Sequence, residues 1–262
     1  SDAALQPDEN QVATRLTGSG TIDLGANPKF DATIASGVIA QPPRDATKDE
    51  GAQPYEWVRL LSELRAPVAP PVPGKVTLDV GELDLRAMSL RDVHIEALTD
   101  GKAWTIDTAR GTLPGNSVAT LSGTLGSSAD KAKFDGTLAL TTDRLDTLAA
   151  LWRRPDEQNP LVGVPAAFDA HVSLEGDTLA LSRGVLDFDR HQHAVTAVVG
   201  LVGTRSLDFT AHFGALSPTD SAIVLALAPD LRADPTLAQS FPQGTVNLSA
   251  ESATIAGLAG SG

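Results

Sequence analysis

The chain has 262 residues, 42% of them apolar and 20% charged, and its 33 acidic and 20 basic side chains give a net charge of −13. This composition excludes intrinsic disorder, and a negative surface repels phosphate backbones, so nucleic acid is not an expected partner. Cysteine is absent, which removes disulfides, thiol catalysis and thiolate metal sites.

The first strongly periodic segment, residues 54–64, predicts a helix. Its apolar residues recur at i, i+3, i+4 and i+7, the spacing of one helical face: Trp57, Leu60, Leu61 and Leu64. The segment before it, 41–54, is a loop by composition, and the Pro-rich segment 66–73 after it is a linker.

Alternation of apolar and polar residues predicts strands farther along the chain, at 75–80, 133–140 and 167–174. In the first of them, Val76 and Leu78 fall on one face and polar residues on the other. Helical spacing returns at 143–152 and, more weakly, at 220–227. The clear helices stop before prolines, as helices do.

Turn-forming residues separate the strands at 26–28, 100–101, 114–116 and 175–177. Gly, Asp, Asn and Pro at this regular spacing favour antiparallel hairpins over parallel strands joined by helices. The fold class predicted from the pattern is therefore mainly β, with a few short helices.

An internal repeat accompanies these elements. Residues 16–20 and 29–33 recur as 121–125 and 133–137, and a looser copy occupies 199–210. Each copy reads as a series of strands, and the two clear copies continue into a helix, so neighbouring copies would extend one sheet in a single direction. The few short helices provide little covering material, and a folded-over sheet would bury its apolar faces against each other or against a guest.

The motifs between residues 73 and 152 resemble those of a known family. A Leu-Pro-Gly turn at 113–115 precedes a strand of small residues, and a Phe-x-Gly strand at 134–136 precedes a Leu-rich helix at 145–152. In their order and spacing these motifs are similar to the AsmA-like domain of Gram-negative envelope proteins. The similarity extends less closely over 11–65 and loosely over 166–258.

This resemblance implies a long, curved, antiparallel-rich sheet folded into a trough or half-barrel from degenerate repeats. It also implies a relation to bridge-like lipid transfer proteins, which carry phospholipid acyl chains between the inner and outer membranes while the headgroups stay solvated. The expected location is the periplasm, with an inner-membrane anchor formed by an N-terminal helix. This sequence lacks such a helix, so we expect it to be a piece of a longer protein that meets membranes through regions outside it.

The predicted units follow the repeat and the resemblance. They are a first unit with a terminal helix at 1–65, the linker at 66–73, the best-matching unit at 74–155, a degenerate unit at 156–240 and the start of a further unit at 241–262.

The residues predicted to line a lipid groove are the apolar members of the alternating strands. Their alternation fits an open groove and a closed core equally well. They are Val76, Leu78, Val80, Trp104, Ile106, Leu121, Phe134, Leu138, Leu140, Phe168, Val172, Leu174 and Phe209.

Catalytic and metal-binding motifs are not found, and no catalytic residue, metal ligand or cofactor is predicted. The nearest candidate is the run that holds Asp187, Asp189, His191 and His193, which would share one face of an unbroken strand. Such a face is either an acid/base or metal site or a solvated strand end. The tryptophans Trp57, Trp104 and Trp152 are either stacking platforms for sugars or part of the core.

Two rival functions remain. A structural or adhesive β-module predicts a closed core without lipid, with Ca²⁺ in its Asp-rich turns. A carbohydrate-active enzyme requires a cleft with two carboxylates about 5–10 Å apart, for which Asp187 and Asp189 are the first candidates.

Overall fold

The structure is a computed structural model that describes most of the chain. The described residues are 2–5, 14–40, 55–65, 67–85, 88–128, 131–153, 159–228, 240–255 and 258–261. The predicted loop at 41–54 lies outside them.

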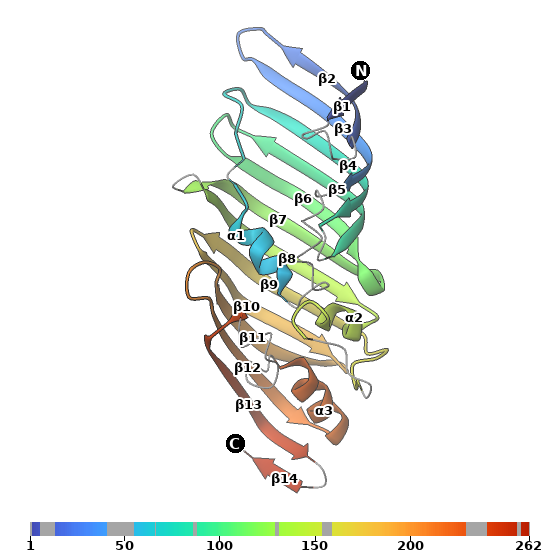
Figure 1. Ribbon diagram of the computed structural model, residues 1–262, viewed down its shortest axis with the longest axis vertical. Coiled ribbons are helices and arrows are strands. Elements are labelled where there is room, and N and C mark those ends of the chain that lie inside the picture. Colours follow the sequence, from blue (N-terminus) through green and yellow to red (C-terminus); the bar gives the residue numbers. More distant parts are fainter. Residues whose placement is uncertain are drawn as a thin grey trace, which may run out of the picture.

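The described strands form one 14-stranded sheet in which spatial order follows chain order from β1 to β14 (Figure 1). The strands are β1 Asp2–Leu5, β2 Thr14–Asp23, β3 Lys29–Ala40, β4 Gly74–Asp84, β5 Ser89–Thr99, β6 Trp104–Leu113, β7 Ser117–Ser128, β8 Lys131–Thr142, β9 Ala166–Glu175, β10 Thr178–Phe188, β11 His191–Gly200, β12 Ser206–Leu216, β13 Gln243–Ile255 and β14 Leu258–Ser261. The predicted mainly β fold is confirmed, and the strands predicted at 75–80, 133–140 and 167–174 lie in β4, β8 and β9.

Most neighbours pair antiparallel, but β3 with β4 and β12 with β13 pair parallel. The expectation of hairpins throughout is therefore wrong at these two places. A parallel pair needs a crossover long enough to carry the chain back to the starting edge. The helix α1 (Glu56–Ser62) lies in the first crossover and the helix α3 (Pro218–Leu227) in the second.

The helices differ in how well the sequence predicts them. α1 falls inside 54–64, and α2 (Leu145–Ala149) covers only the centre of 143–152. The weakest prediction, at 220–227, corresponds to α3, the longest of the described helices. Its buried Ile223 and Val224 are followed by Leu225, which is 56% exposed, so apolar residues surround the helix and blur its periodicity.

The N-terminus of α3 has its own stabilising contacts. The Ser217 hydroxyl accepts a hydrogen bond from the Asp220 backbone N–H at 3.2 Å, and the Asp220 carboxylate accepts one from the Ser217 N–H at 3.1 Å. This reciprocal capping box satisfies two helix-terminal donors and fixes where α3 begins.

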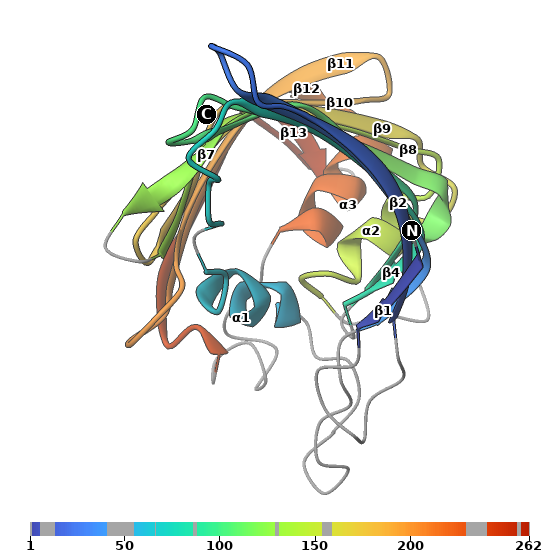
Figure 2. The ribbon, with the colours of Figure 1, turned by 90° about the horizontal axis from the view of Figure 1, so that it is seen from above.

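The sheet is strongly curved. Seen from above, its strands form an open arch around α1, α2 and α3 (Figure 2). Register shifts interrupt the β5–β6, β6–β7, β9–β10 and β10–β11 pairs. Such bulges bend a strand and increase its twist. Three of these shifts hold a residue in the left-handed region: Asp92 at φ 51° in the β5–β6 pair, and Arg183 at φ 51° in both pairs of β10.

The sheet crosses the predicted unit boundaries without a break. The β3–β4, β8–β9 and β12–β13 pairs join residues on the two sides of these boundaries. Within the described part of the chain, no helix is both long and apolar enough to cross a membrane.

Candidate functional site

The side of the sheet that faces the helices, here called the concave face, carries continuous rows of apolar side chains. One row follows the strand register from Ile34 of β3 through Leu78, Ile95 and Ala109 to Leu121 of β7. It continues into β8 and β9. Because facing residues in paired strands point to the same side of a sheet, the row forms one apolar surface across the strands.

All thirteen predicted groove residues lie on this concave face, in rows that the register connects. Four of them are buried: Val80, Phe134, Val172 and Leu174. The other nine are half-buried: Val76, Leu78, Trp104, Ile106, Leu121, Leu138, Leu140, Phe168 and Phe209. The structure therefore places the whole predicted set on one surface, and burial varies along it.

Over β8–β12 the concave face is covered. Tyr55 and Val58 of α1 pack into a first core cluster with Phe134, Leu174 and Leu201. The covering segment is held by the Tyr55 backbone N–H, which donates to the carbonyl of Leu151 at 2.8 Å. α2 and α3 cover the rest through a second cluster, with Leu145, Leu161, Phe188, Phe213 and Ile223 among its buried members. This part of the surface is a closed core.

The three tryptophans differ in their contacts with the core clusters. Trp57 and Trp152 pack against the core clusters, and their indole N–H groups donate to the carbonyls of Leu151 at 3.1 Å and Leu227 at 3.0 Å. Trp104 is half-buried at the start of β6. The two helix-associated tryptophans are therefore partly buried residues that pack against the core.

Over β2–β5 the concave face is different, and we call this region the uncovered part. Its residues belong to neither core cluster, and none of the described helices stands in front of these strands (Figure 1). Leu78 and Ile95 are half-buried, and Ile22 at the outer end is 71% exposed. Only Val80 and Val93 on this part of the sheet are buried apolar side chains among the described residues.

The opposite, convex face carries charged pairs over β4 and β5. Lys75 and Glu96 pair at 2.8 Å across β4–β5, and His94 pairs with Asp79 at 2.7 Å beside them. The hydrogen bond to Asp79 raises the pKa of His94, and the hydrogen bond from Lys75 lowers the pKa of Glu96. These are solvated cross-strand pairs, which hold register rather than form a reactive centre.

The expected shared face of the Asp/His run is wrong. Asp189 and Arg190 both have positive φ, 48° and 65°, and form the tight turn between β10 and β11. Asp187 pairs with Gln192, whereas His193 pairs with Leu186 and is buried on the concave face. The hairpin reverses the chain, so the alternation cannot continue through it.

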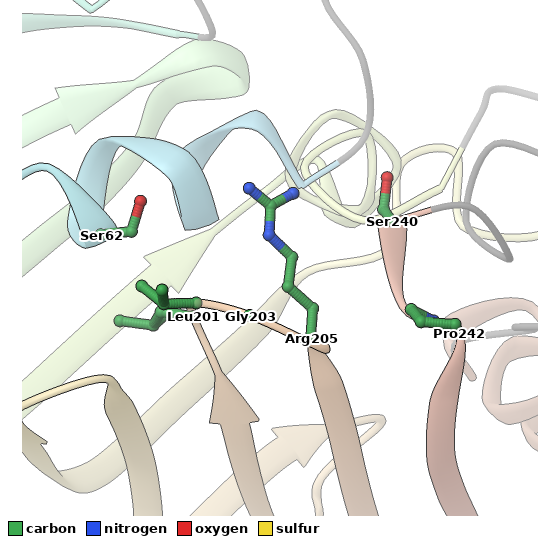
Figure 3. Close-up of a pocket in the computed structure, with 7 residues that line it drawn as sticks. Ser62, Leu201, Gly203, Arg205, Ser240 and Pro242 are labelled. Atoms are coloured by element: carbon green, nitrogen blue, oxygen red, sulfur yellow. The ribbon is translucent and has the colours of Figure 1, made fainter.

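Two cavities open at the rims of the arch. The larger, about 710 Å³, is lined by Asp143, Asp187 and Asp189 together with Arg190 and Phe188. In the described residues, no three His, Asp or Glu side chains form a group that could hold a metal ion. The smaller, about 330 Å³, lies between the end of α1 and the β11–β12 turn and is lined by Ser62, Arg205 and Ser240 (Figure 3).

Sequence reasoning missed several members of the apolar surface. Val93 and Ile95 of β5 lie on the concave face, but the bulge at Asp92 disrupts the alternation that would have marked them. Ile34 was not singled out although it alternates with Ala32 in β3, and strand pairing with Leu78 identifies it. The cavity around Arg205 has no sequence signature, because its residues come from three separate segments.

No family model, curated protein or solved structure matches this chain.

Proposed function

We propose that this chain is a non-enzymatic periplasmic segment that binds or conducts phospholipid acyl chains along the concave face of its sheet. The observation that supports this most is the uncovered part over β2–β5. Its apolar side chains continue in register into the covered core, yet they belong to neither core cluster. Apolar surface that lies outside both core clusters and under none of the described helices favours an apolar guest.

The chemistry of the surface suits an acyl chain. Each buried CH₂ contributes about 0.8 kcal/mol, so a chain of many carbons is held by the sum of small, similar contacts. The rows offer Val, Ile, Leu and Ala side chains without a charged residue among those from Ile34 to Leu121. A guest on such rows has no single strong anchor, so it is able to slide along them.

The same proposal includes the setting in which the segment works. The resemblance of 73–152 to the AsmA-like domain supports an envelope protein that contributes to outer-membrane lipid homeostasis, anchored to the inner membrane by a helix outside this sequence. The convex face, with its charged pairs over β4 and β5, would stay in water while the concave face holds the chains.

A structural β-module is the second candidate, and one observation favours it. Over β8–β12 the concave face is already filled by α1, α2 and α3, as in a protein that needs no guest. If the whole chain were a structural module, the uncovered part would bind no lipid.

Extraction of the purified protein with organic solvent, followed by mass spectrometry, tests the proposal. We expect the wild type to release phospholipid. Leu78→Arg places a charge in the uncovered part and should release much less. Thr77→Arg is the matched control, because Thr77 is the neighbouring residue on the convex face. Lipid-free wild-type protein would leave the structural module as the function.

A further inference from the structure

The smaller cavity contains an arginine, Arg205, that has no partner among the described residues. Figure 3 shows the Arg205 side chain rising from the start of β12, with its guanidinium between Ser62 at the end of α1 and Ser240. Arg205 is half-buried, and in the described part of the chain it makes no ion pair or hydrogen bond. By contrast, Lys131 pairs with Asp177.

A partly buried guanidinium without a counter-charge is costly, because it loses water and gains nothing in exchange. The cost is removed when an anion enters the cavity. A guanidinium presents several N–H donors in a planar fork that matches the oxygens of phosphate, with two parallel charge-assisted hydrogen bonds.

The rest of the cavity supplies further donors. Ser240 contributes a hydroxyl, and Val202 and Gly203 of the turn between β11 and β12 also line the cavity, where Gly203 has φ 70°. The N–H groups of these two turn residues take no part in the backbone hydrogen bonds among the described residues. None of the described residues that line the cavity carries a carboxylate that would repel an anion.

The floor of the cavity is apolar and joins the core. Leu201 lines the cavity and is a buried member of the first core cluster. That cluster extends to Ile106 and Leu121, which lie on the concave rows of β6 and β7. A cavity with a charged side chain, Arg205, next to an apolar one, Leu201, fits a ligand that has both a phosphate and an apolar part.

We propose that the cavity around Arg205 is a binding site for a phosphate-bearing group, with Arg205 as its principal ligand. Its volume of about 330 Å³ lies within the range of about 300–1,000 Å³ that small-molecule sites occupy. The phosphate comes from free phosphate or from a phospholipid headgroup. The second source rests on the proposed function, and the first does not.

Isothermal titration of the full chain with two probes tests the site and separates the sources. The probes are inorganic phosphate and dihexanoyl phosphatidylglycerol as a dissolved monomer. Arg205→Gln should weaken the binding of phosphate by about ten- to a hundredfold, the loss expected when hydrogen bonds to a charged group are removed. Arg110→Gln makes the same charge change at an exposed position on the convex face and should leave the affinity unchanged.

Arg205→Lys provides a second variant in case Arg205→Gln fails to fold. It keeps the charge but loses the planar fork, so we expect an affinity between those of the wild type and Arg205→Gln. Binding of both probes that depends on Arg205 supports a lipid headgroup. Binding of phosphate alone supports the site and counts against lipid as its source.

Equal affinity for phosphate in the wild type, Arg205→Gln and Arg110→Gln would overturn the site, as would no binding by the wild type. In either case phospholipid released by solvent extraction would still support the proposed function. Conversely, Arg205-dependent phosphate binding by a lipid-free protein would leave the site in place while the proposed function fails.

Discussion

The aromatic ring of Phe30 in β3 lies directly over Gly74, its register partner across the parallel β3–β4 pair. A Cβ on Gly74 would lie 2.6 Å from Phe30 Cγ and closer to two other ring carbons. Phe134, the equivalent residue of the repeat, lies against Gly136 of its own strand β8, where a Cβ would be 2.6 Å from its Cζ. The repeated Phe thus lies against a glycine in both clear copies, on the paired strand in the first and on its own strand in the second.

This contact predicts that Gly74→Ala overpacks the sheet. We expect a loss of about 1–3 kcal/mol in the free energy of unfolding, the usual cost of forcing extra atoms into a packed site. Gly37→Ala is the control, because the space beside Gly37 is open and its φ is ordinary. Urea denaturation measures both, and equal stability of the two variants would contradict the contact.

His193 predicts a pH dependence of stability. Its ring lies 4.6 Å from that of Phe188 and 5.0 Å from that of Phe213, and its Nδ1 is buried without a hydrogen-bond partner. Burial, with a smaller contribution from the charge of His191, holds the pKa of His193 below its ordinary value of 6.5. Asp220 of α3 and Asp187 of β10 act weakly in the opposite direction.

The direction in which stability changes with pH follows from the pH at which the folded and unfolded chains bind the proton. The unfolded chain takes up the proton at a higher pH than the folded one, so this group leaves stability unaffected well above pH 6.5. Stability falls as the pH drops through 6.5 toward the lower pKa of the folded state. Urea midpoints between about pH 8 and about pH 5 should shift less for His193→Leu than for the wild type. A change of the same size in His193→Leu would rule out His193 as the cause, and His212→Gln is the exposed-histidine control.

The capping box predicts the behaviour of α3. Ser217→Ala removes the hydroxyl that accepts from the Asp220 N–H, and we expect a loss of about 1 kcal/mol in stability. Thr219→Ala changes an exposed residue in the same turn and should be nearly neutral. Thermal unfolding followed by circular dichroism compares them. An unchanged melting temperature for Ser217→Ala would show that the cap does not stabilise the helix.

Replacing a leucine by arginine should have opposite effects on the covered and the uncovered parts of the concave face. Leu138→Arg puts a charge beside the first core cluster and should cost at least about 2 kcal/mol, the lower limit for removing a core leucine. Leu78→Arg lies in the uncovered part, so the fold should survive while lipid is lost. Denaturation and lipid extraction on the two variants decide this. Unfolding by both would indicate that β4 also belongs to a closed core.

The sequence was sufficient for the β class and for the face on which each groove residue lies, because alternation in β4, β8 and β9 is regular. It was not sufficient for the parallel pairs, since the direction of a strand after a long crossover leaves no trace in its alternation. The hairpin at Asp189 and Arg190 was missed because neither residue is the Gly that usually marks such a turn. Which strands the helices cover depends on contacts far apart in the chain, such as Trp57 with Leu151.

Site-specific photocrosslinking shows whether lipid lies on the concave face. A photoreactive amino acid replaces Leu78 on the concave face or its neighbour Thr77 on the convex face, and the protein is illuminated with labelled phospholipid. We predict crosslinked lipid at position 78 and none above background at position 77. Equal labelling at both positions, or none at position 78 in a folded protein, would contradict this prediction.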